Sequence, residues 1–307
     1  MAIGELSYVV LISREPAAAC EVFGRHLGLP RHELAYGDKT LPVFSIGRAA
    51  LVVCPPEHPL VEGDANPGVH HIALATGDLR GAVDRLHAIG MRTASQVAGL
   101  AGRAMCRIDH AATVGVRTVL TEPLALPAHT GGPIERIDHL GVASTDVGED
   151  ERVYSRALGF EVESRQTDME VVMAVESFTS DKYGVVYHNR KPEPVSGLRV
   201  CFITIGDCEL EFLANFNPQQ GAEIKHGEPG TTRQDQGAIT RFVQSRGRGL
   251  HHLALKSADI NGTLTKLAAA GLPMIDKVGR PGSRRALIGF PHPKALGGIL
   301  MHIVQRS

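Results

Sequence analysis

Three apolar runs of this chain carry a histidine near their start, although a buried strand is normally filled by hydrophobic side chains. The runs are "GVHHIALATGD" at 68–78, "RIDHLGVASTD" at 136–146 and "GLHHLALKSAD" at 249–259. A pattern that returns in this way indicates internal repeats, and repeats constrain the fold more than any single motif does.

The two halves of the chain match each other. Tyr8, Phe23 and Gly28 are separated by 15 and 5 positions, and the same two steps recur from His139 onwards. The segments "HHIALATGDLRGAVDRLHAIGM" and "HHLALKSADINGTLTKLAAAGL" also agree in their pattern of apolar and polar residues. Each half divides again, because the runs with histidine all precede an amphipathic helical pattern and then alternating apolar strands.

Each of the four units is therefore predicted to be βαβββ. The fold expected is α+β, with two tandem modules of two units each. We expect an N-terminal module at 1–125, a linker rich in proline and glycine at 126–135 and a C-terminal module at 136–307. The second half has additional residues around 163–196 and 217–245, which we expect to form loops over a site.

Composition excludes several classes of protein. The chain has 32 Lys and Arg against 33 Asp and Glu, and it has no basic stripe that could follow a row of phosphates, so nucleic acid is not an expected partner. No signal peptide and no apolar run of about 18 residues is present, which favours a soluble cytoplasmic protein without a membrane partner. The five cysteines are scattered and never spaced as CxxC, so neither a disulfide framework nor a thiolate metal site is indicated.

Four βαβββ units with "DHLGVA" and "HHLALK" at the start of two of them resemble the vicinal oxygen chelate superfamily of glyoxalases, bleomycin resistance proteins and extradiol dioxygenases. The stretches "GLHHLALKSADINGTLTKLAAAGLPMI" and "RPGSRRALIGFPHPKALGGILMHI" are similar to methylmalonyl-CoA epimerase. A chain as long as two modules instead resembles the extradiol dioxygenases. The resemblance implies strands that curl into an open cup around one divalent metal ion.

The resemblance also implies that four strands each contribute one inward side chain to the metal. The positions that match are His139, Glu211, His252 and His302. Strand alternation places His139 and His252 on the same face, and it predicts that His251 points away from the cup. Glu209 shares a face with Glu211 and remains an alternative. His302 is a departure, since the family usually has a glutamate there.

Other interpretations stay open at these positions. A lone histidine in a strand is more often a hydrogen-bonded core residue than a ligand, and the cup could have lost its metal. The first module supplies, by the same register, Tyr8, Val52, His71 and Leu120, a set that cannot close a metal site. The N-terminal module is therefore expected to be free of metal. The arginines of 280–285 either bind a carboxylate or phosphate at the mouth of the cup or belong to a solvated loop.

Three imidazoles and one carboxylate suit Fe, Mn, Co, Ni or Zn as a single divalent ion. Such an ion can chelate adjacent oxygens of a small substrate and ease proton removal beside a carbonyl. We therefore expect an epimerase or isomerase, or a glyoxalase-type lyase, with Glu211 as catalytic base and Glu209 as its alternative. An extradiol-type or 2-oxo-acid-dependent iron dioxygenase is the second hypothesis, and a non-catalytic small-molecule binding protein is the third. Whether the chain forms a homo-oligomer stays open.

Overall fold

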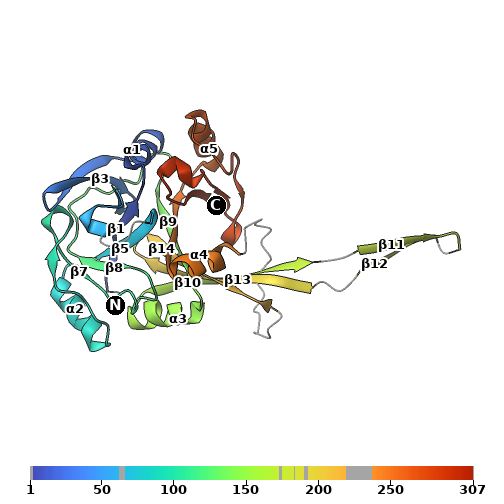
Figure 1. The fold of residues 1–307 in the computed structure, drawn as a ribbon, viewed down its shortest axis with the longest axis horizontal. Helices are drawn as coiled ribbons and strands as arrows, with labels where there is room; N and C mark the ends of the chain where they lie inside the picture. Colours follow the sequence, from blue (N-terminus) through green and yellow to red (C-terminus); the bar gives the residue numbers. More distant parts are fainter. Residues whose placement is uncertain are drawn as a thin grey trace.

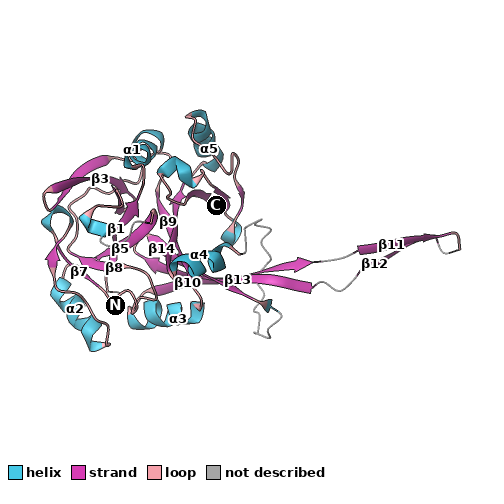
Figure 2. Ribbon diagram, viewed as in Figure 1, coloured by secondary structure: helices cyan, strands magenta, loops and turns pink. Residues whose placement is uncertain are grey.

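The computed structural model describes residues 3–61, 66–172, 175–182, 184–189, 193–218 and 237–306. Two eight-stranded sheets, each curled into an open half-barrel, lie side by side with most of the helices on the outside (Figures 1 and 2). The α+β fold of two tandem modules predicted from the repeats is confirmed. From here on, the first module denotes the residues of the first sheet and the second module those of the second sheet.

The first sheet has the strand order β2-β3-β4-β1-β5-β8-β7-β6. Its strands are β1 (Glu5–Ile12), β2 (Arg31–Tyr36), β3 (Lys39–Ile46), β4 (Ala49–Cys54), β5 (Gly68–Ala75), β6 (Val97–Ala98), β7 (Ala104–Arg107) and β8 (Thr118–Thr121). Helix α1 (Pro16–Glu21) follows β1, and α2 (Leu79–Ala88) follows β5. The first and last strands of each unit pair in parallel, and the two units join through the antiparallel pair β1 and β5.

The second sheet repeats this topology in the order β10-β13-β14-β9-β15-β18-β17-β16. Its strands are β9 (Arg136–Ala143), β10 (Glu161–Val172), β13 (Glu193–Ile205), β14 (Cys208–Phe216), β15 (Gly249–Lys256), β16 (Arg280–Pro281), β17 (Leu287–Gly289) and β18 (Met301–Gln305). Helix α3 (Val147–Glu151) follows β9, α4 (Ala238–Arg246) precedes β15 and α5 (Ile260–Ala269) follows it. Each unit therefore has the predicted βαβββ order.

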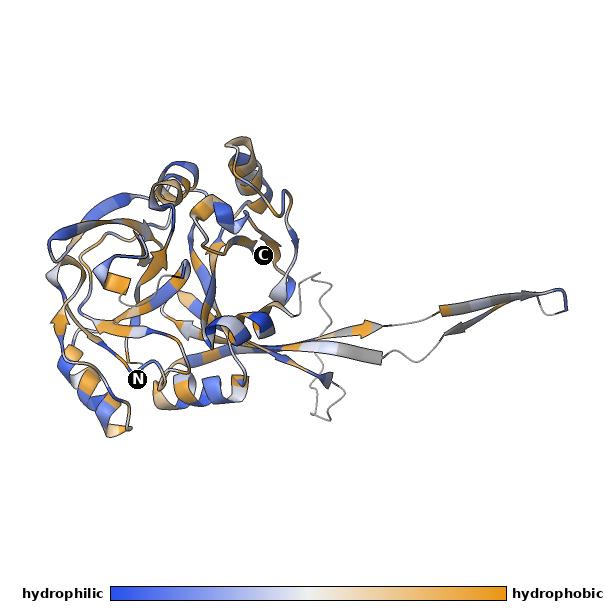
Figure 3. Ribbon diagram, viewed as in Figure 1, coloured by the Kyte–Doolittle hydropathy of each residue, from blue (hydrophilic) through white to orange (hydrophobic). Residues whose placement is uncertain are grey.

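An aspartate sets the start of three of these helices. The side chains of Asp78, Asp146 and Asp259 accept hydrogen bonds from backbone amides in the first turns of α2, α3 and α5. Such a cap satisfies amides that the helix itself leaves without a partner. Figure 3 shows α2 and α3 with both hydrophilic and hydrophobic residues, as expected for helices that cover a sheet on one side only.

The concave faces of the two sheets differ. In the first module one cluster of buried residues, which includes Tyr8, Val52 and Leu100, fills the cup. In the second module two smaller apolar clusters, around Phe202 and around Ile288, lie at the walls and leave a cavity of about 400 Å³ between them. Only the second cup therefore has room for a substrate among the described residues.

The residue of the first module that corresponds to His302 is Val119 and not Leu120. His302 pairs with Ala254 of β15, and the equivalent pair in the first sheet is Ala73 with Val119. Val119 lies in the cluster that fills the cup, whereas Leu120 lies in the core between the sheet and its helices. The assignment of Leu120 was wrong by one residue, and one residue along a strand exchanges its two faces.

The insertion at 163–196 is not a loop over the site. Strands β10 and β13 pair along their length as a hairpin, which β11 (Val175–Ser180) and β12 (Gly184–Asn189) continue into an arm that projects away from the body (Figure 1). A paired hairpin satisfies backbone groups that a long loop would leave to water. Of the second insertion, 219–236 lies outside the described residues, and the part from 238 onwards forms helix α4.

No helix within the described ranges is long and apolar enough to cross a membrane. All five cysteines are buried free thiols, in agreement with the absence of a disulfide pattern in their spacing.

Candidate metal centre

Three histidines from three strands meet at the base of the second cup. His139 of β9, His252 of β15 and His302 of β18 each offer a ring nitrogen, and these nitrogens all lie within 4.8 Å of one another. The Oε2 atom of Glu211 on β14 lies 3.2 Å from Nε2 of His139 and 3.4 Å from Nε2 of His252. All four side chains are buried. The structure thus brings together the four residues that the sequence indicated.

The strand register explains why these four side chains meet. Glu211 and His252 both lie opposite Gly141, one from each neighbour of the central strand β9. A Cβ atom at Gly141 would lie between 2.0 and 2.5 Å from ring atoms of His252, so the ring occupies the space that any other residue would fill. Gly141 was not singled out from the sequence, although a glycine inside a buried strand often marks such a close approach.

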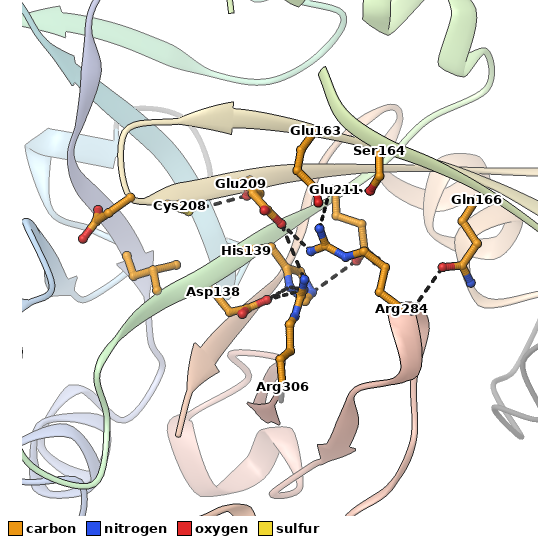
Figure 4. A network of polar contacts seen from close by, with 12 residues as sticks. Asp138, His139, Glu163, Ser164, Gln166, Cys208, Glu209, Glu211, Arg284 and Arg306 are labelled. Carbon is orange, nitrogen blue, oxygen red and sulfur yellow. Dashed lines mark hydrogen bonds and ion pairs between the residues drawn. The ribbon is translucent and has the colours of Figure 1, made fainter. Parts of the chain in front are cut away.

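A carboxylate behind His139 orients its ring. Nδ1 of His139 lies 2.7 Å from Oδ1 of Asp138, and the same oxygen accepts a 2.5 Å bond from Nη2 of Arg306 (Figure 4). This contact holds a proton on Nδ1 and turns Nε2, the atom that would bind a metal, towards Glu211 and His252. A carboxylate in this place is typical of metal-ligating histidines. Neither Asp138 nor Arg306 was predicted to belong to the site.

The histidine doublets lie at a bulge in each sheet. His251 is the extra residue between the pairs Leu250–Val142 and His252–Gly141, and its Nδ1 lies 2.9 Å from Nδ1 of His252. Because two consecutive residues of a bulge face one partner residue, strand alternation fails there. The prediction that His251 points away from the cup was wrong, since His251 lines the cavity beside His252.

The pKa values of the four groups differ according to their neighbours. Burial alone would lower the pKa of His139, but Glu211 and Asp138 outweigh it and raise the value to about 9. Burial would raise the pKa of Glu211, whereas His139 and His252 lower it well below its usual range. Burial lowers the pKa of His252 and of His302. At neutral pH the metal-free cluster therefore has an ionised Glu211, neutral imidazoles at His252 and His302, and a positively charged imidazolium at His139. A metal must displace the additional proton of that imidazolium.

We expect the affinity for a divalent metal to rise about tenfold per pH unit from pH 6 to pH 9. His139 holds a proton below a pKa of about 9, and binding releases that proton. Chelator-buffered Zn²⁺ or Co²⁺ titrations at several pH values measure the slope, and calorimetry in buffers of different ionisation heat counts the proton. Asp138→Asn removes a group that raises the His139 pKa. In that variant the metal affinity should therefore stop rising at a lower pH than in the wild type. An affinity independent of pH in the wild type would contradict the assignment.

The donors fit a single metal ion. Ligand atoms at about 2.1 Å from one ion lie roughly 3 to 3.4 Å apart when they are neighbours, which matches the distances from Glu211 to the two imidazoles. Nδ1 of His302 is buried without a hydrogen-bond partner among the described residues. A histidine cluster with an unsatisfied nitrogen and a carboxylate at its centre has the composition of a site for a borderline transition metal.

Glu209 lies apart from the cluster. Its Oε2 accepts a hydrogen bond from Nη2 of Arg284, whose guanidinium group also bonds Glu163 and lies 3.5 Å from the ring centre of Phe202 (Figure 4). Arg284 has a φ of 54°, a left-handed conformation that costs a non-glycine residue of the order of 1 kcal/mol. This arginine joins the loop before β17 to β10 and β14, so it belongs to the wall of the cup and not to a solvated loop.

Most of the cavity wall is apolar. The apolar side chains that line it include Leu198, Ile239, Ile288 and Phe290, and the polar residues Arg280, Ser283 and Arg306 line it as well. The ring of Phe290 packs 4.6 Å from that of His302. Glu211 lines this cavity. A bound molecule would thus contact the cluster with one end and apolar side chains with the rest.

Residues 138–290, which include three of the four clustered side chains, match the Glyoxalase/Bleomycin resistance protein/Dioxygenase superfamily. The chain belongs to this superfamily. A solved structure of a triple mutant of 4-hydroxymandelate synthase from Streptomyces coelicolor is similar over 100% of this chain and 94% of its own, with a TM-score of 0.62 and 18% identity. That likeness shows the superfamily fold across both modules.

Curated relatives in the superfamily include epimerases. Mitochondrial methylmalonyl-CoA epimerase of Dictyostelium discoideum is 20% identical over 203 residues, which are 62% of this chain and 97% of that protein. The enzyme of Mus musculus is 23% identical over 130 residues, and the match spans 42% of this chain and 64% of the mouse protein. These two relatives are epimerases by name, and the structural neighbour is a synthase by name.

Proposed function

We propose that this chain is a metal-dependent enzyme that moves a proton at a carbon beside a carbonyl group of a small substrate with adjacent oxygens. The observation that carries the proposal is the Glu211 carboxylate, which contacts two imidazoles of the cluster and also lines the cavity. A substrate whose oxygens faced the histidines would bring a carbon next to this carboxylate. The similarity to methylmalonyl-CoA epimerases supports the same reaction class.

His139, His252, His302 and Glu211 would hold one divalent ion. When bound, such an ion supplies Lewis acidity, which favours loss of a proton next to an oxygen it polarises. Asp138 holds a proton on Nδ1 of His139, so Nε2 is the nitrogen that would bind the ion after it loses its own proton. The apolar wall excludes water from the substrate, which strengthens every electrostatic interaction in the cup.

Glu211 is the residue to which we assign the proton transfer, as a weakly held ligand whose carboxylate would leave the ion to take the proton. It is buried, ionised because of its imidazole neighbours and exposed to the cavity. Glu209 is held by Arg284, with Arg306 3.9 Å away, and these two cations balance its charge. We therefore assign Glu209 a structural role in the wall. The size of the cavity, about 400 Å³, favours a compact and largely apolar reacting group.

A dioxygenase is the second candidate because the fold of both modules is similar to that of a 4-hydroxymandelate synthase. His302 stands on the last strand where the family usually has a glutamate. This departure removes the carboxylate that an iron dioxygenase would take from that strand, and it also removes one candidate base of an epimerase, so Glu211 on β14 is the carboxylate of the cluster for either reaction. A non-catalytic binding protein is the third candidate, and a buried carboxylate among three histidines has no evident use in such a protein.

We expect deuterium from heavy water to enter the substrate without any uptake of oxygen. The enzyme would be loaded in turn with Fe, Mn, Co, Ni or Zn and incubated with acyl thioesters, 2-oxo acids and catechols, with mass spectrometry and an oxygen electrode as the readouts. Glu211→Gln should lower the exchange rate at least about 100-fold, the usual contribution of a general base. Its metal content would be measured alongside, to separate loss of the base from loss of the ion.

Glu209→Gln is the matched control, because it removes a carboxylate two residues away on the same strand. It should retain exchange within a few fold. Substrate-dependent oxygen consumption by the iron-loaded protein would overturn the proposal in favour of a dioxygenase. Loss of exchange in Glu209→Gln but not in Glu211→Gln would reassign the base.

A further inference from the structure

A second, larger cavity lies on the seam between the two modules. Its volume is about 830 Å³, and its walls come from the start of β5 and the loop before β8 on one side, and from α4 and the start of β15 on the other. The backbones approach closely at its floor, since a Cβ atom at Gly115 would lie 2.4 Å from the carbonyl oxygen of Arg248. The cavity therefore exists only because the modules are joined in this arrangement.

The ionisable side chains that line this seam cavity are all basic. Its described lining includes three arginines and three histidines and no carboxylate. The arginines are Arg117 from the first module, and Arg246 and Arg248 from the second. Arg248 is neutralised by Glu149 and Asp150 beneath it, at 2.6 and 2.5 Å. Arg117 and Arg246 line the cavity from opposite modules and are both exposed, so a ligand in the cavity could contact both side chains.

Further groups suit an anion with an organic part. Arg246 donates a hydrogen bond to the carbonyl of Pro67 across the seam and lies 5.6 Å from the ring centre of Phe242. Phe242 packs at right angles against His251 in the same wall. Planar guanidinium groups recognise phosphate oxygens in pairs, and ring faces can pack against the rest of a ligand. His251 and Leu300 also line the metal-site cavity, so the two cavities are neighbours.

We propose that the seam cavity is a binding site for a phosphate-bearing anion, held between Arg117 of the first module and Arg246 of the second. The site is separate from the metal ligands and does not depend on which reaction the cup performs. It requires both modules. It also gives the first module, whose own cup is filled, a part in binding a ligand.

Isothermal titration of the full-length chain with inorganic pyrophosphate, at low ionic strength, tests this site. We expect one saturable site per chain, with an affinity that weakens as salt is added. Arg117→Ala should weaken binding at least tenfold, Arg117→Lys less, and Arg117→Ala with Arg246→Ala should abolish it. AMP in place of pyrophosphate tests whether the ring faces add affinity to a phosphate group.

Arg80→Ala is the matched control, because Arg80 is an exposed arginine on α2 that does not line the cavity. It should leave pyrophosphate binding unchanged. Thermal unfolding and metal content of every variant show whether the fold and the metal site are intact. No saturable binding to the wild type below about 10 mM would overturn the proposal, as would equal affinities in the wild type and the double variant.

Discussion

A protein in which His139 and His252 are both replaced by alanine should retain less than about a tenth of the metal bound by the wild type. Each histidine supplies one of the few donors of the cluster, and each touches Glu211. Loss of a partner that merely orients a ligand costs about 10- to 100-fold in affinity, so loss of two ligands should cost more than about a thousandfold. Elemental analysis after dialysis against a metal-buffered solution measures the effect.

The first module offers the control for this experiment. His70 and His71 form the same kind of doublet at the same kind of bulge, with their Nδ1 atoms 2.7 Å apart. Replacing both by alanine should leave the metal content at about one ion per chain. If the His139 and His252 double variant kept its metal, or if the His70 and His71 double variant lost it, the assignment of the metal to the second module would be wrong.

The second module should not be stable in solution without the first. Residues 132–307 expressed alone should be insoluble or should self-associate. The main apolar core is one cluster with residues of both modules, and strands β5 and β15 contact each other at the seam. Several hydrogen bonds also cross between the modules, among them those from the Ile3 amide to the Leu158 carbonyl and from the Tyr154 hydroxyl to the Thr113 carbonyl. Removing the first module would expose this apolar surface, and large exposed apolar patches promote association.

Size-exclusion chromatography with light scattering, followed by metal titration, measures the behaviour of the fragment. Coexpression of residues 1–131 as a separate chain is the complementary control, because it restores the covering surface without the covalent link. It should return a soluble complex with the metal affinity of the full chain. A monomeric fragment that binds metal as tightly as the intact protein would show that the modules are independent.

Repetition in the sequence predicted the architecture well. The units share a period and a pattern, so the βαβββ order and the position of each inward-facing side chain on β9, β14, β15 and β18 could be inferred before any contact was known. Alternation along a strand places every second residue on one face, and the superfamily register selects which face is inside. That information suffices to bring His139 and Glu211 together.

Predictions failed where the alternation of strand residues is interrupted or displaced. At the bulge the count of residues changes by one, which turns His251 towards the cavity. In β8 a register error of one residue selected Leu120 instead of Val119. The conformation of 163–196 was also missed, because apolar residues on two exposed strands of an arm give no clear core face by which a strand is normally recognised.

The groups that surround the ligands could not be predicted from single positions. Asp138 precedes His139 in the chain, and the alternation of a strand would place it on the opposite face. Arg306 lies far from both in sequence and reaches Asp138 only because β18 runs beside β15 in the folded sheet. Contacts of this kind depend on side-chain conformation and on strands brought together by the whole fold.

The filled cup of the first module has a consequence for protein engineering. Grafting histidine or glutamate onto Tyr8, Val52 and Val119 would copy the donor types of the second module, yet every new polar group would enter a close-packed apolar interior. A buried polar group without partners destabilises a fold by roughly 1 to 3 kcal/mol. A second metal centre would therefore require the surrounding side chains to be made smaller first.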